Sequence, residues 1–142
     1  TMHANHFDWA NATFQSKWAK EGDDPAKSMS AKYSVEAVLD GAGAGRAKVS
    51  DANHFLYLVK ANQLFAAGDG KARLAKIKAP TLMIYSPKDM VFMADYVKKT
   101  AETLKAGGAA VTTVELQGNR GHLDGVLSIK QAEKAIGEFL AK

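Results

Sequence analysis

The chain has 142 residues, of which 46% are hydrophobic and 24% charged, a composition typical of one globular domain. It contains no cysteine, which excludes disulfides, thiolate metal sites and a cysteine nucleophile. The net charge of +4 comes mainly from scattered lysines rather than a basic stripe, so we expect no nucleic-acid partner. No apolar run reaches about 18 residues, so we expect no membrane partner, and we expect the cytoplasm as the location.

The first half of the chain is predicted to be helical. Apolar spacing indicates a helix over residues 8–20 and a second, short helix over residues 35–39. The second helix is expected to stop at Gly41, because residues 41–46 are glycines, alanines and one arginine, a composition typical of a loop.

The strongest helical pattern of the first half covers residues 51–67. Ser50 is expected to be its N-cap, and Gly68 is expected to close it at the C-terminal end. Residues 55–59 are apolar on several faces of this helix, a pattern that predicts burial.

The second half changes to alternating strands and helices. A short continuous apolar run at residues 81–85 predicts a strand buried on both faces, and residues 111–116 predict a second strand. Helices are expected up to about Leu104 and near the C-terminus, where Ser128 and Gln131 have the spacing of a capping box. This order predicts a parallel sheet covered by helices. Because two strands are too few for a stable sheet, we expect further strands from another chain or from residues upstream.

Two candidate catalytic residues follow the predicted strands. Asp89 lies four residues beyond the first strand, and His122 lies six residues beyond the second. Functional groups gather beyond the carboxyl ends of parallel strands, so both side chains are expected at one rim. There a carboxylate can hold the Nδ1 proton of a neutral imidazole while Nε2 acts as general base. Each residue alone is typical of a surface loop, but their joint order matches the Asp and His of α/β-hydrolases.

Four stretches of the sequence resemble the homoserine O-acetyltransferase family of the α/β-hydrolase superfamily, and the similarity runs in order from about Phe14 to the end. They are similar to its lid region, the approach to its penultimate core strand, its acid loop and its catalytic histidine motif. In that order they comprise residues 33–39 followed by 50–58, residues 77–84, residues 86–92, and Gly121 with His122.

The resemblance implies a fold and a reaction. The fold class is α/β: the C-terminal part of an α/β-hydrolase fold, with a helical lid in residues 1–69 and the core part in residues 70–142. The reaction is a ping-pong acyl transfer from acyl-CoA, as co-substrate, to a small hydroxylated acceptor through an acyl-serine. Asp89 would be the triad acid and His122 the triad base. No bound cofactor is implied, and the family's lids imply a possible homodimer through the lid.

The sequence differs from the family pattern at two places that concern chemistry. No Gly-x-Ser-x-Gly nucleophile motif is present, so the serine is expected from the N-terminal half of the same enzyme, as a separate chain or a cleaved parent. The acetyltransferases place an aspartate directly after the catalytic histidine, whereas here Leu123 stands there and Asp124 comes next.

Three residues are candidates for substrate binding. Asp124 follows the histidine motif closely, and His54 and Tyr57 fall on the predicted lid helix. We expect no metal site: His3 and His6 have metal-like spacing, but no third ligand lies near them in the sequence.

Two alternatives to the acyltransferase remain open. One is a serine hydrolase of the same fold that acts on an ester or thioester. The other is an inactive fragment or a non-catalytic assembly chain. The first differs from the acyltransferase in whether water or an acceptor hydroxyl takes the acyl group, which the sequence does not decide.

Overall fold

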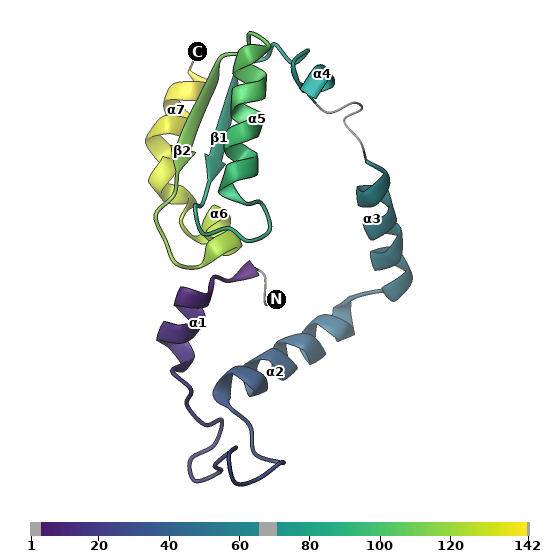
Figure 1. Cartoon of the computed structure of the whole chain (residues 1–142), viewed down its shortest axis with the longest axis vertical. Coiled ribbons are helices and arrows are strands. Elements are labelled where there is room, and N and C mark those ends of the chain that lie inside the picture. The colour runs from purple at the N-terminus through teal and green to yellow at the C-terminus, as the bar shows by residue number, and fades with distance from the viewer. Residues whose placement is uncertain (1–3, 66–70, 142) are drawn as a thin grey trace. The chain divides into compact units, whose positions relative to one another are not determined.

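The computed structural model describes residues 4–65 and 71–141, and these form two compact units. The first unit comprises Phe7–Leu64, and the second comprises the segment that ends at His6 together with the chain from Phe65 onward. Both are drawn in Figure 1, in purple to blue and in teal to yellow respectively. Within the described ranges, no helix is both long and apolar enough to cross a membrane.

The first unit is helical, as the sequence predicts. It contains α1 (Phe7–Phe14), α2 (Ser34–Val49) and α3 (Ala52–Leu64). α1 packs against α2. In the segment that links these two helices, an isolated antiparallel bridge joins Trp18 to Tyr33.

The end of α1 differs from the sequence prediction. The helix was expected to continue to residue 20, but it ends at Phe14. Gln15 and Ser16 have φ angles of 48° and 55°, in the left-handed region that a right-handed helix cannot contain. Neither residue is a glycine, so their composition gave no breaker signal.

The glycine-rich loop predicted for residues 41–46 is wrong, because α2 runs through it. Three features support the helix. Gly41, Gly43 and Gly45 alternate with alanine, the best helix former, and each glycine faces open space. The Oε2 atom of Glu36 accepts a 2.6 Å hydrogen bond from the backbone N–H of Tyr33, which satisfies a donor at the N-terminus.

The start of α3 also differs. Asp51, not Ser50, acts as the cap, since its Oδ1 accepts a 2.6 Å hydrogen bond from the backbone N–H of His54. The helix ends at Leu64 rather than residue 67, and the predicted closure at Gly68 lies outside the described residues.

The apolar row on α3 is not buried in this chain. Its large side chains are between 54% and 79% exposed from residue 55 to residue 58. The prediction of a buried helix is therefore wrong for the chain as described. These side chains remain available to a covering surface.

The second unit carries the strands. Its elements are α4 (Lys71–Leu74), β1 (Thr81–Tyr85), α5 (Ala94–Ala106), β2 (Val111–Glu115), η2 (Gly121–Leu123), α6 (Asp124–Leu127), η3 (Ile129–Ala132) and α7 (Glu133–Leu140). α5 and α7 flank the strand pair in Figure 1. α5 contacts both strands and buries Ala101 and Leu104.

The two strands pair in parallel, as predicted from the alternation of strands and helices. The register begins with Thr81 opposite Val111 and ends with Tyr85 opposite Glu115. The sheet contains only these two strands among the described residues. Because the strands end in register, the loops that follow them start from the same edge.

A capping box at Ser128 is not formed. Ser128 Oγ donates instead to Asp124, and the Gln131 side chain hydrogen-bonds the backbone N–H and C=O of Gln117. The last α-helix consequently starts at Glu133, after a 3-10 turn. Gln131 therefore holds the loop after β2, and Ser128 bonds the buried Asp124.

Candidate active site

The loop after β1 is folded around the carboxylate of Asp89. Its Oδ1 accepts hydrogen bonds from the backbone N–H groups of Val91 and Phe92, at 2.7 and 2.9 Å. This is local side-chain-to-backbone bonding that the short Asp side chain favours in turns. It leaves Oδ2 directed to a partner from outside the loop.

That partner is His122. Its Nδ1 lies 2.9 Å from Oδ2 of Asp89, and the side chains of His122 and Asp89 are 36% and 10% exposed. Since the carboxylate accepts, the imidazole donates through Nδ1–H and keeps Nε2 as its basic nitrogen. The ring of Phe92 packs edge-on against His122, with centroids 5.3 Å apart. Both the tautomer and the orientation of the imidazole are therefore constrained.

Gly121 places His122 in this position. It has a φ of +63°, and a Cβ there would lie 3.0 Å from both His6 N and Lys88 O. A side chain is disfavoured by conformation and by space at once. The glycine therefore lets the loop after β2 lie directly against the loop after β1.

The N-terminal segment of the second unit packs onto the loop after β2, which carries His122 and is called the base loop. Arg120 Nε donates a 3.2 Å hydrogen bond to Oδ1 of Asn5, and the backbone of His6 adjoins Gly121. Sequence reasoning missed this contact, since two polar residues near a terminus carry no periodic signal. His3, the other half of the metal-like pair, lies outside the described residues.

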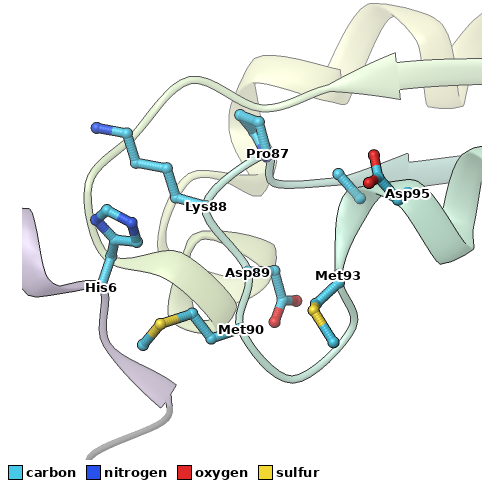
Figure 2. A pocket seen from close by; sticks show the side chains of 8 residues that line it. His6, Pro87, Lys88, Asp89, Met90, Met93 and Asp95 are labelled. Carbon is cyan, nitrogen blue, oxygen red and sulfur yellow. The ribbon is translucent and has the colours of Figure 1, made fainter.

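Two open cavities meet at Asp89. One, of about 350 Å³, is lined by residues 82–85 of β1 together with Ser86, Phe92 and His122. The other, of about 430 Å³, is lined by His6, Lys88 and the methionines of the acid loop. Figure 2 shows Asp89, Met90 and Met93 on this loop, with His6 entering from the N-terminal segment. The dyad is accessible from the first cavity.

Asp124 does not line either cavity. It is only 1% exposed, and its carboxylate accepts hydrogen bonds from Arg120 N, Ser86 Oγ and Ser128 Oγ. The predicted contact with substrate is not supported by this buried position. The aspartate belongs to the framework beneath the dyad.

The other two substrate-binding candidates, His54 and Tyr57, lie on α3 in the first unit. Both are exposed, and Tyr57 is among the exposed aromatic side chains of that helix. Their part in substrate binding stays a prediction. In the described part of the chain, no three His, Asp or Glu side chains are grouped as metal ligands would be.

Comparison with known proteins shows what the chain is similar to. The chain is 28% identical over 137 residues to a homoserine O-acetyltransferase of Symbiobacterium thermophilum. The matched region covers 89% of the chain and 36% of that protein. It is 30% identical over 124 residues to a serine O-succinyltransferase of Stenotrophomonas maltophilia. Here the matched region covers 83% of the chain and 33% of that protein. No family model matches.

Solved structures agree with this. A crystal structure of an esterase superposes on 99% of the chain with a TM-score of 0.83 at 33% identity, and the match spans 39% of the esterase. The homoserine O-acetyltransferase from Bacillus anthracis gives a TM-score of 0.85 at 25% identity, spanning 38% of that protein. The chain is a homoserine O-acetyltransferase-like segment of the α/β-hydrolase superfamily. The predicted family resemblance and fold class, the C-terminal part of an α/β-hydrolase fold, are confirmed.

This homoserine O-acetyltransferase-like chain spans about a third of the length of the curated relatives it matches. Those relatives are acyltransferases, and the similar solved structures include both an acyltransferase and an esterase. The chain is thus related to enzymes that transfer or hydrolyse acyl groups.

Proposed function

We propose that the chain supplies the general base His122 and its orienting acid Asp89 to a serine-dependent acyltransferase. The observation that carries the proposal is the 2.9 Å contact between Nδ1 of His122 and Oδ2 of Asp89, beyond the carboxyl ends of two parallel strands. A largely covered carboxylate that fixes the Nδ1–H tautomer is the arrangement that a base needs for activating a hydroxyl. The similarity to acyltransferases supports the same reaction class.

The proposed reaction has two halves. In the first, Nε2 of His122 takes the proton of a serine hydroxyl as its oxygen attacks the acyl carbonyl of an acyl-CoA. The proton then goes to the leaving CoA sulfur, and an acyl-serine remains. In the second, Nε2 takes the proton of a small hydroxylated acceptor, whose oxygen attacks the acyl-serine. The proton returns to the serine oxygen. Asp89 stabilises the imidazolium formed in both halves.

The serine is proposed to come from the N-terminal part of the same enzyme, as a separate chain or within a longer parent. The 142 residues contain no Gly-x-Ser-x-Gly motif. The chain spans about a third of its relatives, and its sheet has two strands among the described residues. The cavity between β1 and His122 is the position where an added strand and its nucleophile would face Nε2.

An esterase is the second candidate, and Leu123 is the observation that favours it. The acetyltransferases that the chain resembles have an aspartate directly after the catalytic histidine, whereas Leu123 is apolar and half-buried. An apolar residue there cannot pair with the ammonium group of an amino-acid acceptor. One of the similar solved structures is an esterase. In this case water would take the acyl group from the serine.

The experiment uses the full-length protein or the assembled complex. Purified protein is mixed with acyl-CoA, with and without homoserine, serine or other hydroxylated acceptors, and free CoA thiol and acylated acceptor are measured. The acyltransferase proposal predicts thiol release that rises with acceptor and an equal amount of acylated acceptor. Thiol release independent of every acceptor would assign the esterase. No turnover of acyl-CoA or of simple esters would refute both.

A further inference from the structure

We propose that Asp124 is a positioning residue that joins the acid loop to the base loop and thereby sets the separation of Asp89 and His122. The inference rests on the proposed function of that dyad. It concerns a buried carboxylate that lines neither of the two cavities at Asp89 and does not belong to the acid–base pair. Its hydrogen bonds reach both catalytic loops at residues close to the dyad.

On the acid side, the connection runs through Ser86. This residue directly follows β1, is 3% exposed, and donates from Oγ to Oδ2 of Asp124 at 3.4 Å. The same Oγ accepts the backbone N–H of Lys88 at 3.3 Å, and the Ser86 carbonyl accepts that of Asp89 at 3.2 Å. Ser86 thus holds the turn that carries Asp89, while Asp124 holds Ser86.

On the base side, the connection is to the backbone. The N–H of Arg120, two residues before His122, donates to Oδ2 of Asp124 at 3.1 Å. The base loop also lies directly on this carboxylate, because a Cβ on Gly118 would overlap it. One oxygen atom therefore receives a donor from each catalytic loop.

The other oxygen fixes Asp124 itself. Its Oδ1 accepts Ser128 Oγ at 2.9 Å, four residues further along the chain. Ser128 belongs to neither catalytic loop. A fully desolvated carboxylate is costly unless its acceptor sites are filled, so the bond from Ser128 offsets the cost of burying Asp124. The two donors on Oδ2 are the ones that connect the acid loop to the base loop.

The matched pair Ser86→Ala and Ser128→Ala tests this connection. Each variant removes one hydroxyl donor to the same carboxylate, but only Ser86 lies on the acid loop. In the full-length enzyme, Ser86→Ala is expected to lower kcat about 10- to 100-fold with KM nearly unchanged, since small displacements of a catalytic group have such effects. Ser128→Ala is expected to lower the melting temperature similarly and to change kcat only slightly. Equal loss of kcat in both variants would overturn the proposal.

A double-variant cycle separates positioning from general destabilisation. If Ser86 and Asp124 act through Asp89, then Ser86→Ala or Asp124→Asn should have almost no further effect on kcat in an Asp89→Asn background. Asp124→Asn is chosen because it keeps the shape of the side chain and one carbonyl acceptor. Effects that simply add to that of Asp89→Asn would show that Asp124 supports the fold and not the dyad.

A readout independent of turnover keeps this inference distinct from the proposed function. Exchange of the His122 Nδ1 proton with water is followed by NMR in the folded wild type and in Asp124→Asn, with ¹⁵N-labelled histidine. The proposal predicts faster exchange in the variant, since the bond to Asp89 loosens. Unchanged exchange would overturn it. If His122→Ala retained full activity while exchange was faster in Asp124→Asn, the proposed function would fail and the positioning role would stand.

Discussion

Nδ1 of His122 lies 2.9 Å from Oδ2 of Asp89, and this contact spans 33 residues of sequence. It forms because β1 and β2 end in register, with Tyr85 opposite Glu115, so the two following loops leave from one edge. Leu116, fully buried, continues the alignment by donating its backbone N–H to the Tyr85 carbonyl at 2.8 Å. The dyad is thus a consequence of strand register rather than of local sequence.

Replacing Asp89 by Asn should remove catalysis while keeping the fold. If the amide NH2 of the introduced Asn faces the imidazole, it either opposes the Nδ1–H group or donates to Nδ1 and favours the wrong tautomer, with the proton on Nε2. Loss of this acid in a comparable triad lowers kcat by about 10⁴-fold. The measurement is kcat of the full-length enzyme with acyl-CoA, beside its circular dichroism spectrum. Glu102→Gln, on the exposed face of α5, removes one carboxylate far from the dyad and is the control. Activity of Asp89→Asn within tenfold of wild type would contradict the acid role.

Replacing Gly121 by Ala should destabilise the second unit and disturb the base loop. The position has a φ of +63°, and a Cβ there would lie only 3.0 Å from two backbone atoms. A non-glycine residue in that conformation costs about 1–3 kcal/mol. Gly137→Ala is the matched control, because Gly137 lies in α7 with open space around it, and alanine there should stabilise by about 0.5–1 kcal/mol. Denaturant unfolding measures both. Equal effects of the two substitutions would show that the turn does not require glycine.

Replacing Leu123 by Asp tests the choice between acyltransferase and esterase. If an acid beside the histidine holds an amino-acid acceptor, the variant should raise the ratio of acyl transfer to hydrolysis with homoserine or serine. The ratio is measured by chromatography of acylated acceptor and free acid. Val126→Asp is the control, because it adds the same charge at a residue that is 71% exposed and does not directly follow His122. An unchanged ratio in Leu123→Asp would show that this position does not select the acceptor.

The contribution of Tyr85, at the end of β1, to the stability of the protein should be lost at alkaline pH. Burial first, and then the 3.1 Å hydrogen bond to Glu115, raise the pKa of Tyr85 above its ordinary value of 10.0. The neutral phenol is favoured in the fold, so its contribution is fully present below about pH 10 and is lost as the pH rises through the folded pKa. Denaturation midpoints of wild type and Tyr85→Phe, measured from pH 8 upward, should therefore converge above pH 10. A constant difference would contradict the raised pKa.

The sequence predicted the core of the second unit well. The apolar run at residues 81–85 is β1, and the alternation of strand and helix correctly indicated a parallel pair. The expected burial of β1 on both faces is not met in this chain, because all five of its residues are only half-buried. The placement of Asp89 and His122 side by side followed from the same topology.

What the sequence did not predict depends on contacts between distant segments. The sequence predicted that Asp124 binds substrate. In the folded chain its carboxylate instead accepts hydrogen bonds from three donors. Ser128 and Gln131 have helix-capping spacing, but Ser128 bonds Asp124 and Gln131 bonds the loop after β2. The glycine-rich composition of residues 41–46 predicted a loop where α2 continues. In each case a local preference was weaker than a tertiary hydrogen bond or than the alanines in between.

The most direct test of the central claim is formation of an acyl-enzyme. Full-length protein is mixed with acyl-CoA in the absence of acceptor, and intact mass and peptide mapping follow the acyl group over time. We predict an acyl adduct on a serine outside these 142 residues, formed about 10³-fold or more slowly in His122→Ala. Acylation at the same rate in His122→Ala, or no adduct together with turnover, would contradict a serine mechanism that depends on this dyad.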